Sequence, residues 1–229
     1  MSKAFDAVKT DSILQATVIL IYADDVKIFM PIRTNADCLR LQIDMNNFGI
    51  FCSDNGLSIN ADKCSVMTFS RKIYPHVFQY VYNGIVLPRK ETVRDLGVTF
   101  DSTLSFTSHI DNVIKDGLKF FALVRRYGRD LNDPYSILAI YTGLVRSKLD
   151  FSSVVWRPQY VVHIQRIEAV QKKFVRFALR NLSYNGDQLP PYQDLCALVN
   201  IDTIHCRHKI TDIIFFTNIL SGRTDSKLF

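Results

Sequence analysis

The chain has 229 residues, of which 48% are hydrophobic and 22% are charged, and its net charge is +6. This is the composition of an ordinary globular protein that can bury a core, and the sequence has no low-complexity tract and no internal repeat. We find neither a signal peptide nor an apolar stretch of membrane-spanning length. We therefore expect an intracellular protein of the cytoplasm or nucleus, not secreted and without a membrane partner.

The cysteine pattern argues against a zinc site or a disulfide framework, because the count is odd and no Cys-x-x-Cys occurs. The cysteines are predicted to be small buried hydrophobic residues in a reducing compartment. They are Cys38, Cys52, Cys64, Cys196 and Cys206.

Residues 17–30 place the sequence Tyr-Ala-Asp-Asp, at residues 22–25, between two apolar runs rich in β-formers. This pattern predicts a hairpin of buried strands with a tight acidic turn. Adjacent carboxylates repel one another unless a cation lies beside them, and the oxygens of Asp24 and Asp25 suit Mg²⁺. The alternative is an ordinary surface turn, because aspartate favours turns through local hydrogen bonds.

A helix is expected over residues 35–55, with Gly56 just after its last turn. Its apolar stripe is predicted to include Leu39, Ile43, either Met45 or Phe48, Phe51 and Cys52.

Short strands are predicted at residues 57–59 and 65–69, around a turn that contains Lys63. A hairpin with strands at residues 77–81 and 85–87 is predicted from Asn83-Gly84, a strong signal for a two-residue turn. A further strand is predicted at residues 95–101, where Gly97 allows either a close backbone approach or a tight bend.

From residue 107 the apolar period becomes helical, and three helices are predicted. The first ends at Gly128, the second begins at Asp133-Pro134, and the third follows a break at Arg157-Pro158. Their stripes are Ile110, Val113, Ile114, Leu118, Phe121 and Val124; Ile137, Leu138, Tyr141, Leu144 and Val145; and Ile164, Ile167, Val170, Phe174 and Phe177.

Two further helical patterns, at residues 192–199 and 203–220, carry no chemistry that we can assign. Trp156, the single tryptophan, is predicted to pack rather than to stack on a base. The histidines His163, His205 and His208 are interpreted as surface or packing residues.

The positive charge is concentrated in residues 107–182, which hold 13 lysines and arginines against 6 aspartates and glutamates, whereas the rest holds 15 against 16. Such a segment attracts nucleic acid with an affinity that depends on salt. A solvated helical surface without a partner is the alternative. Opposite the apolar stripe of the third helix lie Arg166, Lys172, Lys173, Arg176 and Arg180.

The Tyr-Ala-Asp-Asp hairpin resembles the metal-binding motif of the reverse-transcriptase palm, and several other segments follow in the order of that family. Motifs in the right order are more specific than any one alone. Together they resemble the reverse transcriptase of non-LTR (LINE-class) retrotransposons, most of all the jockey-like elements. The segments are residues 2–8, 60–64, 68–71, 95–101, 144–156 and 166–176.

The resemblance implies an α+β fold with three parts. A partial reverse-transcriptase palm sheet would occupy residues 1–104, an all-helical thumb residues 105–182, and a C-terminal helical extension residues 183–229. It also implies RNA-directed DNA synthesis by two-metal chemistry with Mg²⁺, for which Mn²⁺ can substitute. The partners would be an RNA template, a DNA primer, their hybrid duplex and deoxynucleoside triphosphates.

In this family Asp24 and Asp25 would be catalytic metal ligands, and Tyr22 and Ala23 would belong to the same cofactor-binding motif. Lys63 would approach the nucleotide phosphates and assist the leaving group. Gly97 would lie in the hairpin that holds the primer end. The five basic residues of the third helix would contact the phosphates of the duplex without reading its sequence.

Two parts of the family pattern are missing. Asp6 matches the end of the first palm motif, so that motif's metal-binding aspartate would fall just before Met1. The Pro-Gln-Gly segment of the family does not occur between Asp6 and Tyr22. The resemblance therefore implies a truncated fragment that is inactive alone. The alternatives are a non-catalytic nucleic-acid-binding module and a decayed remnant.

Overall fold

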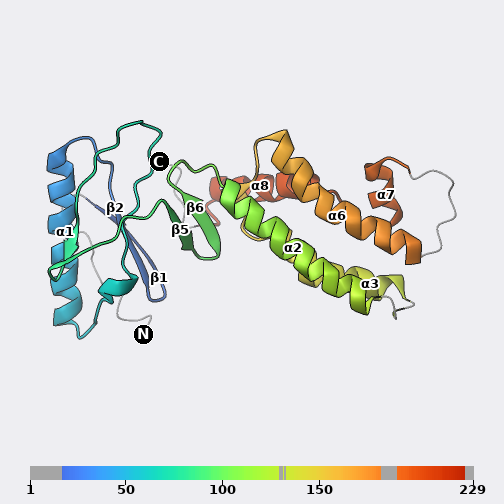
Figure 1. Ribbon diagram of the computed structural model, residues 1–229, viewed down its shortest axis with the longest axis horizontal. Helices are drawn as coiled ribbons and strands as arrows, with labels where there is room; N and C mark the ends of the chain where they lie inside the picture. The colour runs from blue at the N-terminus through green and yellow to red at the C-terminus, as the bar shows by residue number, and fades with distance from the viewer. Residues whose placement is uncertain (1–16, 129–130, 132, 182–189, 225–229) are drawn as a thin grey trace. The chain divides into compact units, whose positions relative to one another are not determined.

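The computed structural model describes residues 17–128, 131, 133–181 and 190–224, and the chain divides into two compact units, Met1–Val93 and Arg94–Phe229. Helices and small two-stranded sheets make up the first unit, and the second is mostly helical (Figure 1). The fold is therefore α+β, as the sequence predicts. No helix in the described parts is both long and apolar enough to cross a membrane.

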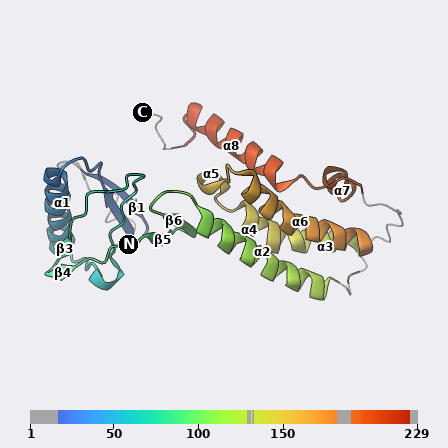
Figure 2. The same cartoon turned by 45° about the horizontal axis from the view of Figure 1, so that its top comes forward.

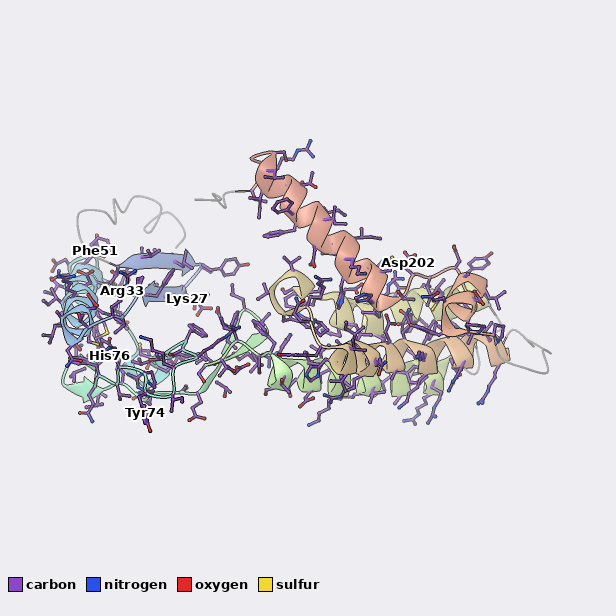
Figure 3. The ribbon with its side chains drawn as sticks, turned by 90° about the horizontal axis from the view of Figure 1, so that it is seen from above. Lys27, Arg33, Phe51, Tyr74, His76 and Asp202 are labelled. Atoms are coloured by element: carbon purple, nitrogen blue, oxygen red, sulfur yellow. The ribbon has the colours of Figure 1, made fainter. Side chains whose placement is uncertain are left out.

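The first unit begins with the predicted hairpin, formed by β1 (Val18–Tyr22) and β2 (Asp25–Phe29) in antiparallel register. Helix α1 (Asn35–Asp54) follows, and the hydroxyl of Thr17 donates a hydrogen bond of 2.9 Å to the buried carboxylate of Asp44. This bond ties the base of the hairpin to the helix. The tip of the hairpin points away from α1 (Figures 1 and 3).

Local signals fix both ends of α1. Thr34 caps the start, because its hydroxyl accepts from the backbone N–H of Asp37 while the Asp37 carboxylate accepts from the N–H of Thr34. At the other end Gly56 has a φ of 70°, in the left-handed region where glycine is not strained. The predicted helix is confirmed, and its end differs from the prediction by one residue.

The buried face of α1 is rotated from the predicted stripe. Leu39 and Ile43 are 54% and 50% exposed, so their assignment to the core is wrong. At Gly49 an added Cβ would lie 2.7 Å from the ring of Tyr82, so the absence of a side chain leaves room for that ring. The core on this side consists of Cys38, Phe48 and Cys52.

The rest of the first unit contains less strand than predicted. The expected strands at residues 57–59 and 65–69 do not form, and only Val66 makes an isolated parallel bridge, to Arg89. The predicted Asn83-Gly84 turn is confirmed, with φ values of 49° and 78°. It joins β3 (Val81–Tyr82) to β4 (Ile85–Val86).

Strands β5 (Thr92–Asp95) and β6 (Val98–Asp101) form a small sheet where the two units meet along the chain. A single strand was expected over residues 95–101, but Leu96 and Gly97 have φ values of 44° and 88° and turn the chain back. Helix α2 (Thr107–Tyr127) follows and ends at Gly128, as predicted.

The loop between β6 and α2 is organised by one carboxylate. Asp101 accepts hydrogen bonds from the hydroxyls of Thr103 and Ser105 and from the backbone N–H groups of Thr103, Ser105 and Phe106. Burial alone would raise the pKa of Asp101, but these hydrogen bonds outweigh it and lower the pKa to about 2.

Asp101 should therefore contribute a pH-dependent share of stability. Because its folded pKa is depressed, the contribution is present above the unfolded pKa of about 4 and is lost as the pH falls toward 2. We expect the difference in melting temperature between the wild type and Asp101→Asn to shrink over that window. The same difference for the exposed Asp116→Asn should stay constant. Parallel changes in both variants would contradict the prediction.

The second unit is a helical bundle in which α2, α3 (Pro134–Tyr141), α4 (Ser147–Asp150) and α6 (Val161–Asn181) lie side by side (Figure 2). Asp133 caps α3 as predicted, through hydrogen bonds from the N–H groups of Tyr135 and Ser136. The elements after α2 are α3 (Pro134–Tyr141), a π-helical turn (Thr142–Arg146), α4 (Ser147–Asp150), α5 (Ser153–Trp156) and α6 (Val161–Asn181).

Most residues of the predicted apolar stripes of α2, α3 and α6 lie in the core of the bundle or against it. The rings of Tyr141 and Phe174 stack with centroids 3.6 Å apart, and neither residue is accessible to solvent. Trp156 is buried between the rings of His109 and His208, which confirms its packing role. Leu144 is the exception, at 41% exposed.

Helices α7 (Tyr192–Leu198) and α8 (Ile204–Leu220) correspond to the two C-terminal patterns, and a buried carboxylate holds them to α6. Glu168 accepts from the hydroxyl of Tyr192 at 2.5 Å and from the backbone N–H of His205 at 2.7 Å. Burial, followed by the neighbouring Glu168, raises the pKa of Tyr192. The tyrosine thus stays protonated as a hydrogen-bond donor.

The cysteine prediction holds for three positions. Cys38, Cys52 and Cys196 are buried and free, and Cys64 is half-buried. Cys206 is exposed on α8, so its assignment as a buried hydrophobic residue is wrong.

Candidate functional site

The acidic pair lies at the tip of the first hairpin. Tyr22 pairs with Asp25 across the ladder, which leaves Ala23 and Asp24 as a two-residue turn. Ala23 adopts a φ of 54°, the left-handed conformation that such a tight turn requires. Asp24 is therefore an exposed residue of the turn, and Asp25 begins the second strand.

The hairpin buries only one of its faces. Ile19, Ile21, Val26 and Ile28 lie on the half-buried face, because strand neighbours alternate between faces. The opposite face carries Val18, Leu20, Tyr22, Asp25, Lys27 and Phe29.

This arrangement corrects the expectation of a buried acidic hairpin. Tyr22 is 64% exposed, and Ala23, Asp24 and Asp25 are exposed with it. The continuous apolar run before the turn suggested a strand covered on both faces, but a two-stranded sheet packed on one side leaves the other open. The carboxylates are solvated, as in the alternative of an ordinary surface turn.

A two-metal centre at the acidic pair stays a prediction. Nowhere in the described parts do three or more His, Cys, Asp or Glu side chains gather as a metal site. Two carboxylates leave Mg²⁺ mostly hydrated, and Mg²⁺ gives up water reluctantly. Asp6, the other acidic residue of the family pattern, lies outside the described residues. We therefore assign no catalytic step to the pair in this structure.

Lys63 is the last residue of a short 3-10 helix (Ala61–Lys63) in the same unit and is exposed. Its backbone N–H donates to the carbonyl of Asn60 at 3.1 Å, which closes the turn. Among the described residues no hydrogen bond or ion pair joins the Lys63 ammonium to Asp24 or Asp25. A role for Lys63 at nucleotide phosphates stays a prediction.

The local backbone geometry explains why a glycine occupies position 97. Its φ of 88° is a conformation that side chains rarely adopt, and an added Cβ would lie 3.0 Å from the ring of Phe151. The tight bend, one of the two interpretations from sequence, accounts for a glycine here. Contact with a primer end stays a prediction.

The basic residues of α6 form a more coherent surface. Arg166, Lys173, Arg176 and Arg180 are exposed and share one side of the helix, at intervals of seven, three and four residues. We call Lys173, Arg176 and Arg180 the basic stripe. Among the described residues none of these three side chains has an ion-pair partner.

The two other predicted basic residues are engaged within the unit. Arg166 forms an ion pair of 2.6 Å with Asp111 of α2. Lys172 is half-buried, with its ammonium 4.9 Å from the centroid of the Tyr192 ring. A cation over an aromatic ring is stabilised where it is. These two side chains are therefore less available to a nucleic acid than the stripe.

Sequence reasoning did not single out the basic residues of α2, although they contribute to the charge count of residues 107–182. Helix α2 packs along α6 in the same direction, as the Arg166–Asp111 pair and the contact between the Phe121 and Phe177 rings show. The 3.6-residue period of α2 could have shown which of its basic residues lie opposite the apolar stripe. The exposed residues are Lys115, Lys119, Arg125 and Arg126.

Taken together, the described residues form an α+β protein with an exposed acidic turn in one unit and a basic helical surface in the other. Comparisons with protein-family models, curated protein sequences and solved structures find no match for this chain.

Proposed function

We propose that the chain is part of an RNA-directed DNA polymerase of the LINE class, and that it does not transfer nucleotides by itself. The observation that carries this proposal is the Tyr22–Asp25 turn, a tight two-residue turn that presents both carboxylates at the end of a β-hairpin. The order of the other motifs along the chain supports the same family.

In this proposal the two units have different tasks. The acidic turn would lie near the primer end and the nucleotide, where Mg²⁺ or Mn²⁺ would neutralise phosphate charge when bound. The basic stripe would hold the hybrid duplex of RNA template and DNA primer through its phosphates. The Pro-Gln-Gly segment of the family pattern does not occur between Asp6 and Tyr22, and this is the reason to expect no synthesis by this chain alone.

The test uses a DNA primer annealed to an RNA template, with a photoreactive group at the primer 3′ end. We expect no primer extension with Mg²⁺ or Mn²⁺, but cross-linking of the 3′ end to the peptide that contains Tyr22 and Asp25. A primer labelled at its 5′ end is the control and should not cross-link to that peptide. Equal labelling from both ends would contradict the placement.

Extension by the purified chain would also contradict the proposal, provided that it depends on the acidic pair. The double variant Asp24→Asn, Asp25→Asn identifies such activity, because it removes both charges with little change in volume. A background signal that survives this variant would come from a contaminant.

A second function is favoured by the basic stripe: a non-catalytic module that binds duplex or hybrid nucleic acid without sequence preference. It requires only exposed cations on a rigid helix, and the stripe provides them. The two functions differ at the acidic turn, which the module would not use.

A further inference from the structure

Helix α8 carries a stripe of exposed residues that the described part of its own unit does not cover. The stripe consists of Cys206, Ile210, Ile213, Thr217 and Leu220, at intervals of four, three, four and three residues. Intervals that alternate between three and four place residues on the seam by which two helices pack in a coiled coil. All five residues are exposed.

The surroundings of this seam are apolar too. Ile214 and Phe216 flank it and are 55% and 53% exposed, and no charged residue occurs from Ile213 to Leu220. The one hydroxyl on the seam is already satisfied, because Thr217 donates to the carbonyl of Ile213 at 2.8 Å. Covering the seam would therefore leave no polar side-chain group without a partner.

The opposite side of α8 holds it to the bundle. Ile204 and His208 are buried there, Arg207 pairs with Asp150, and Asp212 lies 2.6 Å from Arg157. Beyond this attachment the helix rises away from the other helices of its unit (Figure 3). Asp202, labelled in that view, marks the attached end.

We infer that the seam of α8 binds the same seam of a second copy, so that the chain forms a two-fold symmetric dimer. Five large apolar side chains of the seam and its flanks are 45–65% exposed. At about 100 Å² each, a pair of copies would bury roughly 1,000 Å², which is the lower limit for a specific interface. A self-complementary stripe suits this symmetry, because the same patch serves both copies.

Charge favours an antiparallel pair. Lys209 is exposed beside the start of the seam, so parallel helices would bring the Lys209 side chains of the two copies together. Antiparallel helices separate them. Setting Ile210 against Ile213 of the other copy places the isoleucines at the centre, and Cys206 then lies opposite Thr217.

Sedimentation of the full chain at micromolar to tens-of-micromolar concentrations tests the dimer. We expect a reversible monomer–dimer equilibrium whose dissociation constant rises at least about tenfold in Ile213→Lys, because a charge would be buried on the seam. The control is Val162→Lys, which changes a side chain of similar exposure (58%) on another helix, α6. Ile213 is 65% exposed, so the variant should fold and melt like the wild type.

Oxidative cross-linking tests the orientation. The variant Thr217→Cys should form a covalent dimer through Cys206, and the double variant Thr217→Cys, Cys206→Ser should not. A wild-type chain that cross-links rapidly through Cys206 would contradict the antiparallel arrangement. A chain that stays monomeric throughout, or that is monomeric and binds phosphatidylcholine vesicles through α8, would overturn the dimer.

Discussion

Replacing Gln171 by leucine should lower the free energy of unfolding by about 2–4 kcal/mol, although the two side chains are similar in size. Gln171 is inaccessible to solvent and links three parts of the second unit. It accepts a hydrogen bond of 2.9 Å from the hydroxyl of Tyr141, and donates to the hydroxyl of Tyr192 at 3.0 Å and the carbonyl of Asp202 at 2.8 Å. Leucine would leave the Tyr141 hydroxyl and the Asp202 carbonyl unpaired.

Urea denaturation followed by circular dichroism measures this effect. The matched control is Gln165→Leu on the same helix, where the side chain is exposed and the change should stay within about 0.5 kcal/mol. Equal stability of the two variants would show that the buried network does not contribute. A wild-type chain without a cooperative transition would instead favour the decayed remnant.

This network also shows what the sequence could not reveal. Gln171 lies within a helical pattern whose apolar residues were identified correctly, and nothing in its neighbourhood marks it as buried. Its partners are about 20 to 30 residues away along the chain. Hydrogen bonds over such distances depend on the packing of α3, α6 and α7, which no local pattern encodes.

The helices were predictable where the signals are local. The 3.6-residue period gave the extent of α2, and Asp133-Pro134 marked the start of α3. The turn at Asn83-Gly84 follows from backbone preferences of two residues. In each case the determining interactions lie within a few residues of one another.

Burial was less predictable than the elements themselves. Helix α1 is apolar on more than one side, so Leu39 and Ile43 were as plausible for the core as Cys38 and Phe48. The first hairpin was found at the expected residues, but the exposure of Tyr22 was missed. An apolar strand does not tell how many layers cover it, because the covering elements come from elsewhere in the chain.

For the candidate site, the sequence identified the basic residues of α6. It did not show which of their side chains are free to contact a nucleic acid. Whether Lys172 or Lys173 is free depends on which side of α6 faces α7. The structure places Lys172 against the Tyr192 ring and leaves Lys173 exposed. This difference determines the variants that test nucleic-acid binding.

Replacing the basic stripe, Lys173, Arg176 and Arg180, by alanine should lower the affinity for an RNA–DNA hybrid on the order of a hundredfold at 0.1 M salt. Each cation that neutralises a phosphate releases counterions, which contributes about 0.9 to the slope of log affinity against log salt concentration. Loss of three contacts should therefore reduce that slope by about 2 to 3. Fluorescence anisotropy with a labelled hybrid, titrated at several salt concentrations, measures both quantities.

Two controls separate the stripe from the total charge of the chain. The exposed residues Arg71, Lys72 and Lys90 of the first unit, replaced together by alanine, give the same change in net charge and should alter the slope by less than about 1. Lys172→Ala should also have little effect, because the ammonium is held over the Tyr192 ring. If the stripe variant and the charge-matched control show equal slopes, the stripe is a solvated helical surface and the nucleic-acid interface lies elsewhere.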